Sequence, residues 1–245
     1  MKTTSERIDI SVGGASMPAY VAKPDGGGKS PGVLLFMEIF GINQHIRSVA
    51  DRVAAEGYVV LAPDLFHRTA PGIELGHDEA GLTKGIDLMG KVKASEVITD
   101  VGAAIKTLQA RDDVDGKSIG AMGFCFGGHV AYLAACEHPV KAVASFYGGG
   151  IASGTPGNDG PATVERTSKI QGRVLCLFGE KDTYISAADV ERIGKALKEH
   201  DVRHEVVVYP GVGHGFFCDA RGDYDKKSAD DAWRRVKALF TEELR

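Results

Sequence analysis

The chain has 245 residues, of which 43% are hydrophobic and 25% charged, a composition typical of globular proteins that fold around a core. Its formal net charge of −4 provides no positive field that would attract a nucleic acid, so nucleic acids are excluded as the expected partner. The first ten residues lack the apolar run of a secretory signal, and we therefore expect a cytoplasmic protein, with no membrane partner, whose four cysteines are free thiols.

Short apolar runs alternate with helical periodicities along the chain, which predicts an α/β fold with a mostly parallel sheet covered by helices on both faces. Buried strands are expected at 31–40 and 58–64, joined by a helix that ends at Gly57. The length, and the lack of any linker, favour a single domain over residues 1–245.

The second half of the chain continues the same alternation of helices and strands. A helix over about 97–108 is followed by a turn and a strand at 118–124. Two later helices are expected to begin at Ser186 and Ser228, because each serine has an aspartate three residues further on. The remaining expected elements are a helix ending near 137 and strands at 141–147, 173–182 and 204–210.

Two glycine-rich segments, 26–30 and 148–165, lie outside the expected helices and strands. The sequence GGGKS at 26–30 resembles the end of a phosphate-binding loop, but Lys23 stands where the first glycine is required and a strand follows instead of a helix. We therefore expect a hairpin or surface turn there. The segment 148–165 has predicted βα units on both sides and is expected to be a long surface loop, to which the sequence assigns no function.

The sequence GFCFGG at 123–128 has the glycine spacing of a nucleophile elbow, with cysteine as its central residue. In such an elbow the nucleophile occupies a strained turn between strand and helix, and Gly123 and Gly127 leave room for that backbone. The helix amino terminus beside Cys125 favours a thiolate. The alternative is an inert buried cysteine where a helix packs closely on a sheet.

Asp182 and His214 follow later strands, so the chain order of nucleophile, acid and histidine is that of α/β-hydrolases. Each residue alone is typical of a turn or loop, but the carboxyl ends of parallel strands gather at one edge of a sheet. Together with Cys125 they predict a triad in which His214 takes the thiol proton and Asp182 orients the imidazole. The backbone amides of Phe126 and Ile39 are expected to hold the oxyanion of a thioester-forming reaction.

Glu38 ends an apolar strand and is expected to face the elbow. A buried carboxylate is costly without a partner. One interpretation is a salt bridge or a helix-capping contact. The other is that Glu38 accepts the S–H of Cys125 in the resting protein and so protects the thiol from oxidation.

The chain resembles the dienelactone hydrolase (carboxymethylenebutenolidase) family of α/β-hydrolases over essentially its whole length. The motifs that carry the resemblance are MEIFGIN, APDLFHR, GFCFGGHVAYLAA, FGEKD and GVGHGFF. It implies a predominantly parallel sheet of about eight strands with helices on both faces, and neither cofactor nor metal. It also implies the site residues, which are a triad of Cys125, Asp182 and His214, Glu38 as partner of the resting cysteine, and Ile39 and Phe126 as oxyanion amides.

The sequence departs from the family at the carboxylate-binding residues. Studied members hold the carboxylate of dienelactone with two arginines, but the corresponding positions here carry Ala80 and Cys218. Arg68, Lys84 or Arg221 could take their place, although the sequence does not show that any of them reaches the site.

The expected function is hydrolysis of a lactone or an activated carboxylic ester, a small-molecule substrate. A thiol nucleophile suits activated esters and disfavours amides, because the tetrahedral adduct expels thiolate unless the other leaving group is equally good. A general carboxylesterase or thioesterase, and a non-catalytic thiol-sensing binding protein, remain as alternatives. We expect a monomer or a small homo-oligomer.

Overall fold

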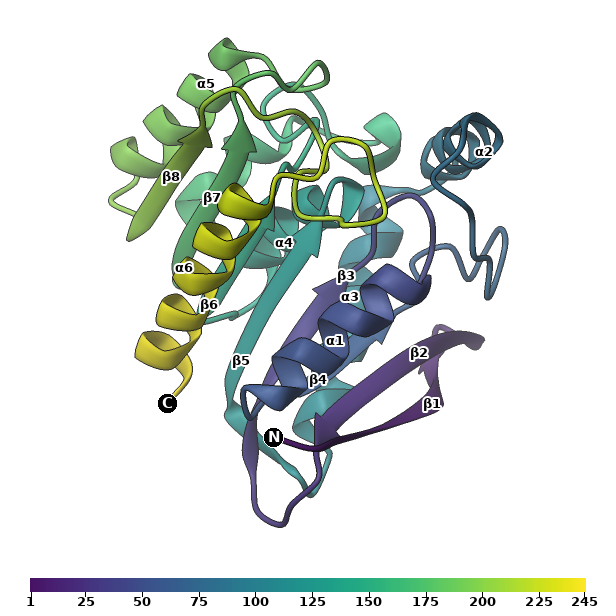
Figure 1. Ribbon diagram of the computed structural model, residues 1–245. Helices are drawn as coiled ribbons and strands as arrows, with labels where there is room; N and C mark the ends of the chain where they lie inside the picture. The colour runs from purple at the N-terminus through teal and green to yellow at the C-terminus, as the bar shows by residue number, and fades with distance from the viewer.

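The computed structural model describes residues 1–245 and is built around an eight-stranded sheet (Figure 1). Along the sheet the strands follow the order β1-β2-β4-β3-β5-β6-β7-β8. The hairpin of β1 and β2 joins β4 in antiparallel pairing, and the other strands from β4 to β8 are parallel. The strands are β1 (Thr3–Val12), β2 (Ala15–Pro24), β3 (Ser30–Phe36), β4 (Val59–Pro63), β5 (Val114–Phe124), β6 (Ala142–Phe146), β7 (Arg173–Gly179) and β8 (His204–Tyr209).

Helices cover both faces of this sheet. In Figure 1, α1 and α6 cross the nearer face, while α3 and α4 pack against each other on the opposite one, and α2 lies beyond the carboxyl ends of the strands. The helices are α1 (Gln44–Ala55), α2 (Glu79–Met89), α3 (Ala94–Gln109), α4 (Phe126–Glu137), α5 (Ala187–Glu199) and α6 (Lys226–Leu244), with short 3₁₀ helices η1 (Pro156–Asn158) and η2 (Thr163–Lys169). The predicted α/β-hydrolase fold class is confirmed.

The central strands are buried on both faces, which explains why they read as continuous apolar runs. Every residue of β4 and β6 is buried, and in β3 only the first two residues are partly exposed. Such strands need helices on both sides of the sheet, and each parallel connection then returns the chain to the same edge. The carboxyl ends of β3, β5, β6, β7 and β8 therefore lie along one edge of the sheet, and the loops that follow them build one site.

Two helix starts test the capping signals in the sequence. Ser186 begins α5 as predicted, because its hydroxyl accepts from the Asp189 amide while the Asp189 carboxylate accepts from the Ser186 amide. The predicted start of the last helix at Ser228 is wrong. Its amide donates to the Asp225 carboxylate at 2.7 Å, so the N-cap is Asp225, three residues earlier, and α6 begins at Lys226.

The amino-terminal hairpin and the segment 26–30 differ in part from the sequence-based expectation. Strands β1 and β2 were not among the predicted elements, because polar residues interrupt their apolar pattern on the partly exposed edge of the sheet. The GGGKS segment lies in the exposed connection from β2 to β3, which are not paired with each other, so it is a surface turn and not a hairpin. No helix combines the length and the apolar sequence that a membrane span requires.

Candidate active site

Cys125 is the single residue between the end of β5 and the start of α4. Its backbone has φ 55° and ψ −117°, a region that L-residues with a side chain rarely adopt, at a cost of about 1–3 kcal/mol. The turn is held by a hydrogen bond of 3.0 Å from the Cys125 amide to the Phe146 carbonyl at the end of β6. The strained turn thus places the Cys125 side chain at the amino terminus of α4.

The glycines of the elbow (residues 123–127) are required by close contacts between backbone segments. A Cβ on Gly123 would lie 2.1 Å from the Gly127 carbonyl oxygen. A Cβ on Gly127 would lie 2.3 Å from the carbonyl oxygen of Phe36, the last residue of β3. The elbow therefore packs directly on the end of β3, which brings the loop with Glu38 and Ile39 beside Cys125.

Asp182 and His214 form a buried hydrogen-bonded pair from the loops after β7 and β8. The distance from His214 Nδ1 to Asp182 Oδ2 is 2.7 Å. The other carboxylate oxygen accepts from the amides of Tyr184 at 2.8 Å and Ile185 at 3.2 Å. With Asp182 fixed in this way, the imidazole carries its proton on Nδ1, and Nε2 is left to face other groups.

The His214 imidazole also contacts two tyrosine rings and the Cys125 side chain. Its ring centre lies 5.0 Å from those of both Tyr147 and Tyr184, and Cys125 is near enough to act on its pKa. Burial lowers the pKa of His214, but the charges and hydrogen bonds of Cys125 and Asp182 outweigh burial and raise the pKa to about 10. His214 is therefore a strong base, able to take the proton of the neighbouring thiol on Nε2.

The two amides predicted to hold an oxyanion belong to residues that line the same pocket as Cys125. Phe126 is the first residue of α4, so its N–H has no acceptor within the helix. Ile39 lies in the loop after β3, packed beside the elbow. Both positions suit donors to an oxygen on a carbon attached to Cys125.

Glu38 is fully buried and its carboxylate lies between the side chains of Arg221 and His77. Arg221 Nη1 donates to Oε1 at 3.3 Å, and His77 Nε2 lies 3.7 Å from Oε2. Burial raises the pKa of Glu38, but His77, Arg221 and His45 outweigh burial and hold the pKa below its usual value. Glu38 is therefore a carboxylate at neutral pH, and its hydrogen bond goes to Arg221. Its predicted contact with the Cys125 thiol stays a prediction.

Of the three basic residues considered as carboxylate ligands, only Arg221 lines the pocket. Arg68 makes a bidentate pair with the buried Asp100, and Lys84 pairs with Asp87 on the exposed face of α2. Ala80 is also exposed on α2. Arg221 provides one positive charge at the pocket, already paired with Glu38.

Glu38, His77 and Cys218 are the residues nearest to a metal-binding set in this region. Their ligand atoms all lie within 4.8 Å of one another, and zinc accepts oxygen, nitrogen and sulfur ligands of this kind. However, Arg221 donates to the same carboxylate, and burial together with Glu38 raises the pKa of Cys218 to about 12, which disfavours the thiolate that a metal requires. The positive charge beside Glu38 is thus provided by the side chains of the chain itself.

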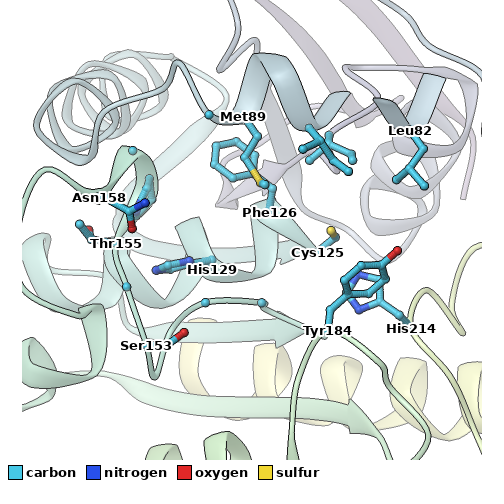
Figure 2. A pocket seen from close by; sticks show the side chains of 18 of the residues that line it. Leu82, Met89, Cys125, Phe126, His129, Ser153, Thr155, Asn158, Tyr184 and His214 are labelled. Atoms are coloured by element: carbon cyan, nitrogen blue, oxygen red, sulfur yellow. The ribbon is translucent and has the colours of Figure 1, made fainter. Parts of the chain in front are cut away.

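The pocket in front of Cys125 has a volume of about 440 Å³ (Figure 2). Helix α2 forms one wall with the apolar side chains of Leu82, Ile86 and Met89. The other contributions come from the elbow, the loop after β3, the segment 149–158, Tyr184 and His214. The site is thus a concave, mainly apolar cavity with the Cys125 sulfur on its surface.

Several pocket residues were not predicted from the sequence. The walls from α2 and from segment 149–158 carry no catalytic motif, and Tyr184 lies in the turn after Asp182, where its amide donates to Asp182 and its ring contacts His214. The one available signal for segment 149–158 was its position directly after the carboxyl end of a predicted strand.

Comparison with known proteins gives consistent matches over nearly the whole chain. The model of the dienelactone hydrolase family matches residues 17–244. A Synechocystis sp. protein named "Putative carboxymethylenebutenolidase" is 45% identical over 226 residues, covering 92% of each chain. An Escherichia coli K12 protein of the same name is 33% identical over 229 residues, covering 93% of this chain and 83% of the relative.

A solved structure agrees with these sequence matches. The crystal structure of a "Putative Dienelactone Hydrolase" from Klebsiella pneumoniae superimposes with a TM-score of 0.89 at 32% identity, covering 99% of this chain and 100% of that one. The fold, the family match and these relatives agree on a hydrolase that acts on a small-molecule substrate. The chain therefore belongs to the dienelactone hydrolase family.

Proposed function

We propose that the protein hydrolyses lactones or activated esters of carboxylic acids through a thioester on Cys125. The observation that supports this most directly is the Asp182–His214 pair beside Cys125, whose sulfur lies at a helix amino terminus on the wall of the pocket. A base, its orienting carboxylate and a thiol in this order provide the elements of nucleophilic acyl transfer.

The reaction divides into two steps. In the first, Cys125 transfers its proton to His214 Nε2 and Sγ attacks the acyl carbon, while the amides of Phe126 and Ile39 hold the oxyanion. The carbon–oxygen bond to the leaving group breaks, and the proton moves from His214 to the departing oxygen. In the second, His214 takes a proton from water, hydroxide attacks the thioester, and the thiolate leaves and regains the proton.

The charges around the site favour an uncharged substrate. Arg221 is the one permanently charged side chain of the pocket wall, and Glu38 lies against it at 3.3 Å. A substrate carboxylate would have to compete with Glu38 for this guanidinium. Neutral lactones and esters need no such exchange, so we propose them as the preferred class, in contrast to a dicarboxylate-derived lactone.

The test is hydrolysis of p-nitrophenyl acetate together with iodoacetamide labelling. Cys125→Ala should lower kcat/KM by about a thousandfold or more, because no other thiol lies beside His214. Iodoacetamide should inactivate the wild type by adding a single carbamidomethyl group, at Cys125. Cys218→Ser, the matched thiol control, should keep its activity. Full activity of Cys125→Ala would contradict the proposal.

The same labelling experiment examines Glu38. If its carboxylate keeps the Cys125 thiol protonated in the free protein, Glu38→Gln should be alkylated faster than the wild type at neutral pH. Coincident pH profiles would leave Glu38 as the partner of Arg221 and His77 alone.

A general carboxylesterase or thioesterase would use the same residues, and it differs in the acyl groups accepted. Comparison of dihydrocoumarin, p-nitrophenyl esters and acyl thioesters as substrates separates these possibilities. Activity confined to thioesters would contradict the lactone assignment, and inactivity towards all three classes would favour a binding protein.

A further inference from the structure

The glycine-rich segment 148–159, which has no role in the steps above, forms the end of the pocket most distant from His214. In Figure 2, Thr155 and Asn158 lie on one side of His129, and Cys125 lies on the other side with Tyr184 and His214. The pocket is therefore elongated, with the reactive sulfur near one end and a loop of small and polar residues at the other.

Thr155 is the polar residue of this distant end whose hydrogen bonding is incomplete. Thr155 lines the pocket, the residue is only 5% exposed, and its Oγ1 is buried without a hydrogen-bond partner. Leaving a buried hydroxyl unpaired costs about 1–3 kcal/mol, so such groups in proteins are normally bonded to a neighbour or a ligand. Ser153 and Asn158 add two further neutral polar side chains around it.

The distant end carries no ionised side chain. Pocket residues 149–158 are glycine, serine, threonine, proline and asparagine. Burial lowers the pKa of His129 to about 4, against a hydrogen bond that the imidazole donates to the Gly149 backbone, so this imidazole is neutral; it is hydrogen-bonded to Thr163 at 2.7 Å. A ligand group bound there should therefore be uncharged and able to form hydrogen bonds.

The space between the two ends suits an apolar chain. Met89 and Phe126 line it, with Ile86 also on the α2 wall. His129 is one helical turn beyond Cys125 in α4, which is about 6 Å along the helix or roughly five bonds of an extended carbon chain. Thr155 lies beyond His129, so a group that reaches it must be separated from the acyl carbon by such a chain.

The segment is held in place by contacts away from the pocket. The Asp159 carboxylate accepts from the amides of Ala94 at 2.9 Å and Ser95 at 3.3 Å, and so caps the start of α3. Gly157 has φ 71°, and a Cβ there would lie 2.0 Å from the Val92 carbonyl oxygen. The polar end is therefore preformed, which reduces the entropy cost of binding.

We propose that Thr155 is the centre of a subsite for a neutral hydrogen-bonding group, such as a hydroxyl, at the end of an extended apolar acyl chain. This inference rests on the proposed function. The acyl chain, and not the leaving group, points there because His214 must deliver its proton to the leaving oxygen and lies on the opposite side of Cys125. The substrate class is then esters of ω-hydroxyacyl groups.

The test compares p-nitrophenyl 6-hydroxyhexanoate with p-nitrophenyl hexanoate in the wild type, Thr155→Val and Thr155→Ser. Valine keeps the shape and removes the hydroxyl, so the ratio of the two kcat/KM values should fall about three- to tenfold, the equivalent of one neutral hydrogen bond. Thr155→Ser should keep the ratio, and p-nitrophenyl acetate, which is too short to reach the subsite, should be hydrolysed equally by all three proteins.

A ratio that changes by less than about twofold in Thr155→Val would overturn the subsite while leaving the hydrolase intact. Failure of all three proteins with p-nitrophenyl acetate would instead contradict the proposed function. The acetate control thus distinguishes the two failures.

Discussion

His214 shows how separate loops fix a single side chain. Asp182 determines which nitrogen carries the proton, and Tyr147 and Tyr184 contact the ring from two sides. The Asp182 carboxylate in turn accepts hydrogen bonds from two backbone amides. Rotation of the Asp182–His214 pair would therefore break these two hydrogen bonds and the two ring contacts. The imidazole is therefore held in one orientation without any ligand.

At this scale we predict that the pKa of His214 falls when its neighbour is removed. Cys125 contributes the largest upward shift on His214, so the pKa of about 10 in the wild type should move towards 6.5 in Cys125→Ala. Nuclear magnetic resonance titration of the imidazole nitrogens measures this directly. An unchanged value would mean that Asp182 alone maintains the shift.

The sign of the accompanying stability change follows from the same shift. Because the pKa of His214 is raised on folding, its stabilising contribution is complete below about pH 6.5 and is lost as the pH rises to about 10. The difference in free energy of unfolding between the wild type and Cys125→Ala should decrease over that range.

At the scale of elements, the contact of α4 with the end of β3 decides the geometry of the site. The Gly127 backbone lies against the Phe36 carbonyl, so α4 starts closer to the sheet than any side chain would permit. This separation sets where the Phe126 and Ile39 amides lie relative to each other.

We predict that Gly127→Ala separates these two elements. Overpacking of this kind costs about 1–3 kcal/mol, and the displaced Phe126 amide should reduce kcat more than it affects KM. Urea denaturation and ester kinetics on the same sample measure both effects. Gly26→Ala is the control, since a Cβ there meets nothing within 4 Å, and it should change neither quantity. Equal activity of both variants would refute the argument.

The sequence predicted the central elements and the polar site residues because each has a local signal. The all-apolar strands, the glycine spacing around Cys125 and the capping box at Ser186 depend on neighbours in the chain. The start of α6 was missed because Ser228 and Asp225 offer competing caps, and only the fold decides between them.

The pocket walls could not be predicted for a different reason. Leu82 and Met89 look like any apolar helix residues, and Thr155 looks like any loop residue, until the fold brings them to the same cavity. Likewise Arg221 was one of three candidates, and its distance from Glu38 in sequence gave no reason to prefer it. Such contacts depend on tertiary packing and leave no periodic pattern.

At the scale of the whole molecule, the carboxyl-terminal helix joins distant parts of the fold. Helix α6 packs on β5, β6 and β7, and a Cβ on Gly120 of β5 would lie 2.8 Å from the Leu244 side chain. Arg245 then donates to the Glu56 carbonyl after α1 and lies 4.7 Å from the centre of the Tyr58 ring. Helix α6 and Arg245 thus connect the central strands of the sheet with the end of α1.

We predict that Leu244→Ala lowers the free energy of unfolding by about 2–5 kcal/mol, because it leaves a cavity beside β5. Leu244 is only 3% exposed, whereas Val208, at 45%, provides a matched exposed position. Val208→Ala should change stability by less than about 1 kcal/mol in the same urea titration. A small effect at both positions would show that α6 is only loosely attached.

The backbone of Cys125 places stability and reactivity in opposition at one position. Glycine would relieve the strain of about 1–3 kcal/mol at φ 55° and lose about 0.5–1 kcal/mol through greater freedom of the unfolded chain. A library of variants selected only for heat resistance should therefore accumulate glycine at position 125 and become inert. Thermostabilisation of this protein needs a selection that also demands turnover.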